Sequence, residues 1–188
     1  LEASASSRPL ALAVCFVGSL DRRKNVGELL SAVEILRKRK VEVAVSIVGD
    51  GPLRDALEQQ ASTIVSDSVS IDFLGALPMP ETQRVMVAND VLVLPSLHDG
   101  WGAVINEAMS MGTLPVCSNK CGAKDIVKLS GFGGVYDVGN PDMLASVLQA
   151  VATNINNVRD KRAERVKWAI DNISPDAVGE LMMTTINR

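Results

Sequence analysis

Short apolar runs alternate with helical patterns along most of the chain. Each run has the length and the Val, Ile and Leu content of a strand that is buried on both faces. The runs are Leu10–Val17, Val41–Val48, Val69–Leu74, Val91–Leu94, Leu114–Cys117 and Gly134–Val138. The strict alternation predicts an α/β fold, a Rossmann-like doubly wound parallel sheet of about six strands with helices on both faces.

The helical segments carry recognisable start and stop signals. Asn25 is a helix-capping residue type, and we expect it to cap a helix that runs to about Arg39. Pro52 suits the first turn of the second helix. Beyond Pro141 the pattern is helical only, with another helix start at Ser174-Pro175. The remaining helices are expected near Glu81–Ala88, at Ala103–Met111 and near Lys124–Val127.

Composition indicates one globular domain. The chain has 188 residues, of which 47% are hydrophobic and 22% charged. The small, polar stretch 1–9 reads as a linker or an artificial remnant, residues 10–188 as the domain, and the part from about 141 as a helical tail. A net charge of −3 gives no reason to expect nucleic acid as a partner. An apolar stretch long enough to span a membrane is absent from the sequence.

The cysteines do not form a recognisable framework. Cys15, Cys117 and Cys121 are odd in number and lack Cys-x-x-Cys spacing. We therefore expect reduced thiols in a cytosolic protein, and neither disulfides nor a zinc site.

The unusual residues gather in one set of loops. Ligands of such sheets bind beyond the carboxyl ends of the strands. The glycine-rich and polar clusters all fall in loops at those ends, namely Gly18–Asn25, Gly49–Pro52, Gly75–Pro80, Pro95–Gly102 and Ser118–Ala123. The loops at the opposite ends are ordinary turns. The sequence therefore predicts a ligand site at the carboxyl edge of the sheet.

The segment from Asp99 to Met109 is the strongest candidate in this set. Gly100 and Gly102 let the backbone approach a ligand closely, and the helix that follows directs free N–H groups at it. Glu107 lies one turn inside that helix and is suited to accept hydrogen bonds from a ribose diol. Asp99, just ahead, is placed to accept from a sugar hydroxyl. Alternatively, Glu107 only interacts favourably with the helix dipole, and Asp99 is only a turn residue.

Four motifs in order resemble the signature of family 4 glycosyltransferases, over about residues 12 to 140. The family usually has glutamate at both acidic positions, whereas the first is Asp99 here. Its arginine after the first strand is replaced by Ser19. The matching segments are Gly18-Ser19-Leu20-Asp21-Arg22-Arg23-Lys24-Asn25, Gly49-Asp50-Gly51-Pro52, Phe73-Leu74-Gly75 and Asp99-Gly100-Trp101-Gly102 with Glu107-Ala108-Met109.

The resemblance implies a role for each matching residue. Lys24 would stabilise the departing diphosphate, Asp99 would position the sugar, and Glu107 would hold the ribose. Arg22 or Arg23 would substitute for the missing arginine, and Trp101 would either pack under the sugar loop or belong to the core. The implied donor-binding set is Gly18, Ser19, Arg23, Lys24, Gly51, Leu74, Asp99, Gly100, Trp101, Gly102, Ala103 and Glu107, with Asp99 and Lys24 as catalytic residues.

The resemblance also implies a function. The chain would be the carboxyl-terminal, nucleotide-sugar-binding half of a GT-B enzyme that transfers a sugar from a UDP or GDP donor with retention of configuration. It implies no metal and no other cofactor. The acceptor would bind a missing amino-terminal domain, so the isolated chain would be nearly inactive.

The expected setting is the cytoplasm, with a peripheral contact of the full-length protein at the inner membrane face, in polysaccharide biosynthesis. Two alternatives remain open. One is half of a sugar-nucleotide epimerase of the same architecture. The other is a non-catalytic scaffold in which Ser19 and Asp99 mark decay of the site. His98, the only histidine, receives no catalytic role.

Overall fold

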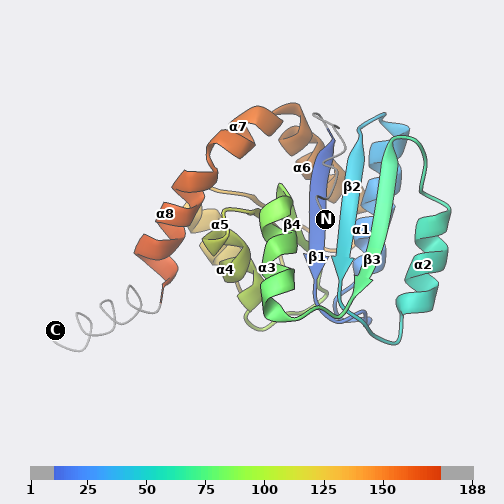
Figure 1. Cartoon of the computed structure of the whole chain (residues 1–188), viewed down its shortest axis with the longest axis horizontal. Coiled ribbons are helices and arrows are strands. Elements are labelled where there is room, and N and C mark those ends of the chain that lie inside the picture. Colours follow the sequence, from blue (N-terminus) through green and yellow to red (C-terminus); the bar gives the residue numbers. More distant parts are fainter. Residues whose placement is uncertain (1–10, 175–188) are drawn as a thin grey trace, which may run out of the picture.

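A computed structural model describes residues 11–174 and shows a six-stranded sheet (Figure 1). The strand order is β3-β2-β1-β4-β5-β6, and every neighbouring pair is parallel. The predicted Rossmann-like α/β fold is therefore confirmed. The strands are β1 (Leu12–Val17), β2 (Val43–Val48), β3 (Val69–Gly75), β4 (Val91–Leu94), β5 (Leu114–Ser118) and β6 (Gly134–Tyr136).

Helices cover both faces of the sheet. In Figure 1, α3 lies in front of the strands and α1 behind them. Helix α1 packs against α6, and α4 packs against α8. The helices are α1 (Val26–Lys38), α2 (Arg54–Ser62), α3 (Met79–Ala88), α4 (Ala103–Ser110), α5 (Lys124–Ser130), α6 (Pro141–Thr153), α7 (Ile155–Asp160) and α8 (Arg162–Ile173).

The core follows the apolar runs of the sequence. All four residues of β4 and all five of β5 are buried, which is the pattern of strands covered on both faces. The edge strand β3 alternates in burial instead, since only part of its surface is covered. Position in the sheet thus explains why the central strands are continuous apolar segments in the sequence.

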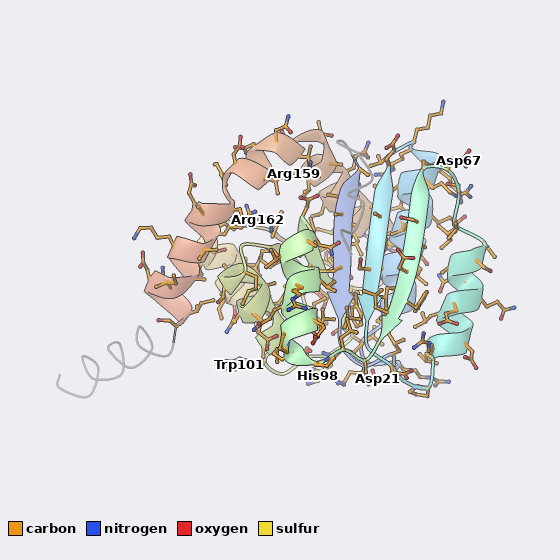
Figure 2. All side chains as sticks on the ribbon, viewed as in Figure 1. Asp21, Asp67, His98, Trp101, Arg159 and Arg162 are labelled. Carbon is orange, nitrogen blue, oxygen red and sulfur yellow. The ribbon has the colours of Figure 1, made fainter. Side chains whose placement is uncertain are left out.

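The site position follows from the strand order. From β1 the chain proceeds outward to β2 and β3, and it then returns to β4 on the other side of β1. The loops that follow β1 and β4 therefore leave adjacent strands in opposite directions, and the crevice between them is where such folds bind ligands. Figure 2 shows Asp21, His98 and Trp101 together at this edge, with Asp67 and Arg159 at the opposite one.

Arginine side chains in α7 and α8 bind these helices to the edge of the sheet opposite the ligand edge. The Arg159 guanidinium in α7 donates from Nε and Nη2 to the two carboxylate oxygens of Asp90, each at 2.9 Å. Arg165 in α8 is only 1% exposed and donates to the carbonyls of Gly112 and Val158, each at 2.8 Å. Its burial lowers the pKa of its guanidinium to about 10. Buried charges require such partners, so α7 and α8 are an integral part of the domain.

Several predicted boundaries differ in detail. Asn25 precedes α1 as expected, but it has a left-handed backbone with φ of 55°, and its side chain makes no capping bond to the helix. Its side-chain NH2 group instead donates to the Glu28 carboxylate and to the Pro95 carbonyl. Pro52 lies before α2, which begins at Arg54, and β6 is shorter than predicted. Residues 1–9, the start of the first predicted strand at Leu10 and the helix predicted from Pro175 lie outside the described residues.

Candidate functional site

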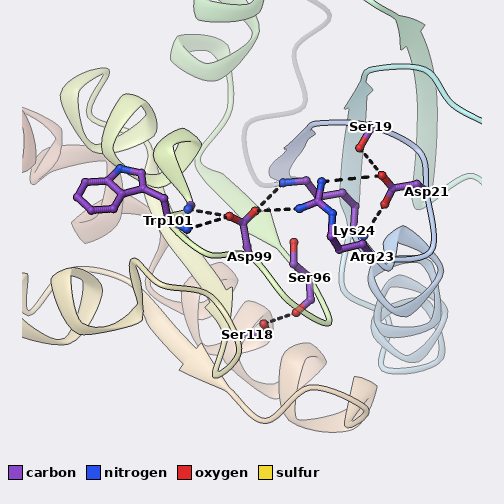
Figure 3. Close-up of polar contacts among 9 residues, drawn as sticks. Ser19, Asp21, Arg23, Lys24, Ser96, Asp99, Trp101 and Ser118 are labelled. Carbon is purple, nitrogen blue, oxygen red and sulfur yellow. Dashed lines mark hydrogen bonds and ion pairs between the residues drawn. The ribbon is translucent and has the colours of Figure 1, made fainter.

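Lys24 and Asp99 meet at the carboxyl edge of the sheet. The Lys24 Nζ atom lies 2.6 Å from Asp99 Oδ2, and both side chains are nearly covered, at 13% and 12% exposure. Lys24 comes from the loop after β1 and Asp99 from the loop after β4, which are the two loops at the switch point (Figure 3). Of the three residues expected to share one pocket, Lys24, Asp99 and Glu107, the structure joins Lys24 and Asp99.

The loop after β1 is folded around Asp21. Its carboxylate accepts a hydrogen bond from the Ser19 hydroxyl at 2.7 Å and another from the Lys24 amide at 2.9 Å. The Ser19 bond is the largest influence that lowers the pKa of Asp21. The Arg23 carbonyl accepts from the Leu97 amide at 2.8 Å, which joins this loop to the loop after β4.

The loop after β4 folds around Asp99 in a similar way. Asp99 Oδ1 accepts from the amides of Gly102 at 2.8 Å and Trp101 at 3.3 Å (Figure 3). Burial raises the pKa of this carboxyl, but the hydrogen bond and charge of Lys24 and the two amides outweigh it, so the pKa is lowered from its ordinary value. Asp99 is therefore a carboxylate at neutral pH.

Arg23 is a second cation beside this pair. Its guanidinium lies 3.9 Å from Asp99 and 3.9 Å from Asp21, and the side chain is half exposed. Ser19, at the position of the family arginine, only bonds Asp21. Arg22 is exposed and makes no ion pair with any described residue. Of the two arginines considered as substitutes, Arg23 is the one that the structure places at the site.

Glu107 lies one turn inside α4, as expected from its spacing. Ile105, Ala108 and Met109 form the buried face of this helix, while Ala103 is exposed and Glu107 is half-buried. The Glu107 carboxylate makes no hydrogen bond or ion pair with the described part of the chain. The structure thus leaves Glu107 free to bind a ligand but does not join it to Lys24 and Asp99.

The glycines of the predicted site have two different surroundings. A Cβ added to Gly51 would lie 2.6 Å from the Leu20 carbonyl oxygen, so this glycine permits contact between two loops of the chain itself. A Cβ on Gly102, where φ is +74°, would lie 2.5 Å from Cys121 Sγ. A Cβ on Gly100 would meet no described atom within 4 Å. Of the three, only Gly100 faces open space. Gly18, like Gly51, approaches other parts of its own chain.

The interpretation of Trp101 as a core residue is wrong. Its side chain is 69% exposed (Figure 3), because the loop around Asp99 turns it away from the sheet. Leu74 is also partly exposed at the end of β3. His98 is exposed at the same edge (Figure 2).

Two serines at this edge were not assigned a role from the sequence. Ser96 is buried, and its hydroxyl lacks a hydrogen-bond partner among the described residues. The Ser118 hydroxyl, at the end of β5, donates to the Ser96 carbonyl at 2.6 Å (Figure 3). The available signal was a serine at or just beyond the carboxyl end of each of two adjacent strands, since both positions fall at the ligand edge.

The chemistry of the arrangement is that of an anion site that is occupied by a side chain. An ammonium group and two amide N–H groups converge on one carboxylate. Such groups bind phosphate as readily as carboxylate. The described residues contain no group of three or more His, Cys, Asp or Glu arranged to hold a metal ion. None of their helices is long and apolar enough to cross a membrane.

The fold and the site define a Rossmann-like domain with an anion site at its switch point. Residues 8–168 match the family described as "Glycosyl transferases group 1". The chain belongs to this family.

Curated relatives and solved structures agree with that assignment. The chain is 28% identical over 173 residues to an uncharacterized glycosyltransferase of Methanocaldococcus jannaschii, covering 88% of this chain and 43% of the relative. It is 33% identical over 156 residues to a 2-deoxystreptamine glucosyltransferase of Streptomyces kanamyceticus, covering 79% and 36%. The chain therefore spans less than half the length of these relatives.

A solved structure of Anabaena HepE in complex with UDP and glucose has a similar fold. Its TM-score is 0.76 at 20% identity, and the match covers 95% of this chain and 48% of that one. This likeness shows that the sheet and helices are arranged as in a GT-B glycosyltransferase.

Proposed function

We propose that the chain is the donor-binding domain of a retaining glycosyltransferase that uses a nucleoside diphosphate sugar. The observation that carries the proposal is the convergence of Lys24 and the Trp101 and Gly102 amides at the switch point. These donors suit a diphosphate, and Anabaena HepE, which shares the fold, is described with UDP.

In this proposal, sugar transfer breaks the bond between the anomeric carbon and the diphosphate. The electron pair leaves with the diphosphate. The acceptor hydroxyl oxygen bonds the anomeric carbon on the face that the diphosphate left, and the hydroxyl proton passes to the departing diphosphate. Lys24, assisted by Arg23, neutralises the departing charge. Asp99 releases Lys24 and accepts from a sugar hydroxyl, and Glu107 accepts from the ribose. We propose that no metal or other cofactor is required, because the cations and amides take over its electrostatic work.

The proposal includes a partner domain. The matched relatives are more than twice as long as the part that this chain covers. We propose that an amino-terminal domain binds the glycan or lipid-linked acceptor, and that residues 10–188 alone bind donor but transfer little sugar. The proposed setting is cell-surface polysaccharide assembly at the inner face of the membrane.

Calorimetric titration with UDP, GDP and ADP tests donor binding. We expect one of the three to bind. We also expect Glu107→Gln to lower the affinity for that nucleotide, because an NH2 group replaces one of the two carboxylate oxygens that would accept from the ribose. Glu34→Gln is the control, since Glu34 is on α1 and, among residues 11–174, forms an ion pair only with Lys38. Failure of all three nucleotides to bind would favour a non-catalytic scaffold. Epimerisation of the sugar nucleotide by the full-length protein, without transfer, would favour the epimerase.

A further inference from the structure

Glu28 is a buried carboxylate close to the site but outside it. It lies in the first turn of α1 and is 7% exposed. Its Oε1 atom accepts from the Gly139 amide at 2.7 Å, and its Oε2 atom accepts from the side-chain amide of Asn25. Burial raises the pKa of Glu28, and these bonds oppose that effect. Burial, and next the charge of Glu28, raise the pKa of Tyr136 in β6.

The Asn25 amide connects Glu28 to the site. Its Nδ2 atom donates both to Glu28 and to the Pro95 carbonyl, the latter at 3.2 Å. Asn25 directly follows Lys24, and Pro95 begins the loop that carries Asp99. Glu28 is thus linked to the loops after β1, β4 and β6.

A carboxylate has properties in this position that an amide lacks. An ionised carboxylate only accepts hydrogen bonds, so it selects the orientation in which Asn25 directs its N–H groups at both Glu28 and Pro95. A glutamine at position 28 has one acceptor oxygen for two donors. If that oxygen stays with Gly139, its NH2 group faces the NH2 group of Asn25, and one of the bonds must break.

We propose that Glu28 is a positioning residue that, through Asn25, holds the loop of Lys24 against the loop of Asp99. The consequence for nucleotide binding rests on the proposed function, whereas the consequence for the Lys24–Asp99 pair does not. A role in helix stability alone would leave that pair unchanged.

The test compares Glu28→Gln with Glu34→Gln, a substitution of the same kind on the same helix at a position whose side chain is 42% exposed. The first readout is the pKa of Asp99, measured by carbon NMR without nucleotide. We expect it to rise toward the ordinary 3.8 in Glu28→Gln, because Lys24 is less well held, and to stay unchanged in Glu34→Gln. The second readout is the dissociation constant of whichever nucleotide binds, which should increase about tenfold in Glu28→Gln only.

A second variant protects the test against misfolding of the first. Asn25→Gly removes the amide while glycine readily keeps the left-handed backbone of that residue. It should raise the Asp99 pKa as Glu28→Gln does, and adding Glu28→Gln to it should cause no further rise. If Glu28→Gln does not fold, Asn25→Gly alone decides by the same readout.

The outcomes separate the two proposals. An unchanged Asp99 pKa in folded Glu28→Gln or Asn25→Gly overturns the positioning role. A raised pKa combined with no nucleotide binding, even by the unsubstituted chain, supports the positioning role and rejects the proposed function.

Discussion

Asp99 holds Lys24 at 2.6 Å across 75 positions of sequence, at the place where the strand order reverses. The same carboxylate accepts from the amides of Trp101 and Gly102. In this structure, Asp99 therefore occupies the donors that the proposed diphosphate requires. Donor binding then involves an exchange of one anion for another.

The exchange predicts that Asp99→Asn binds the bare nucleoside diphosphate more tightly. The substitution keeps the size of the side chain and its acceptor for Gly102 but releases Lys24 from a charged partner. Because ion pairs of this kind contribute up to about 1 kcal/mol, the gain should be up to about fivefold. Calorimetry measures it. Weaker binding of the bare nucleotide would show that Asp99 does not compete with it.

The lowered pKa of Asp99 predicts a pH-dependent contribution to stability. Because the folded-state pKa lies below the ordinary 3.8, the ionised group stabilises the fold above that pH, and the contribution disappears as the pH falls through the folded-state value. The difference in free energy of unfolding between the unsubstituted chain and Asp99→Asn should be about 1 kcal/mol at pH 7 and should shrink below pH 3.8. Urea unfolding across this range measures it, and a difference independent of pH would contradict the account.

Gly102 and Gly100 form a matched pair for substitution by alanine. Gly102→Ala meets Cys121 and a left-handed backbone, and it should lower the free energy of unfolding by about 2 kcal/mol. Gly100→Ala meets no described atom within 4 Å and should change stability by less than about 0.5 kcal/mol. If donor lies in that open space, Gly100→Ala should still weaken its binding. Equal stability losses in the two variants, measured by urea unfolding, would refute the distinction.

Asp90 should matter for stability alone. Its buried carboxylate lies at the sheet edge away from the site. It accepts hydrogen bonds from Nε and Nη2 of Arg159 and from the Ala13 amide. Asp90→Asn should lower the free energy of unfolding by about 2 kcal/mol, because it removes the carboxylate charge that pairs with the Arg159 guanidinium. Nucleotide affinity under native conditions should stay the same. A large loss of affinity in the folded variant would mean that the two edges are coupled.

The sequence predicted those parts of the fold that depend on local pattern. The central strands are buried on both faces, so their apolar runs were evident, and the parallel arrangement brought Lys24 and Asp99 to one edge. Helix spacing also placed Glu107 one turn inside α4, where it is half-buried. Of the two glycines expected to face a ligand, Gly100 faces open space, whereas Gly102 packs against Cys121.

Other features depend on contacts between distant segments, which a local pattern does not encode. Trp101 is exposed because the loop folds around Asp99, although tryptophan is usually well covered. Asn25 is an expected cap whose amide instead bridges Glu28 and Pro95. Arg165 has the sequence appearance of a solvent-facing helix residue, yet carbonyl groups of Gly112 and Val158 hold it in the interior.

The binding of UDP and GDP to Lys24→Met and Arg22→Met tests the central claim most directly. Both substitutions remove one cation from the same loop, but only Lys24 contacts Asp99, whereas Arg22 is exposed without an ion pair to a described residue. The account predicts that the bound nucleotide loses about tenfold or more in affinity in Lys24→Met and stays within about twofold in Arg22→Met. Equal affinities of Lys24→Met and the unsubstituted chain would contradict it.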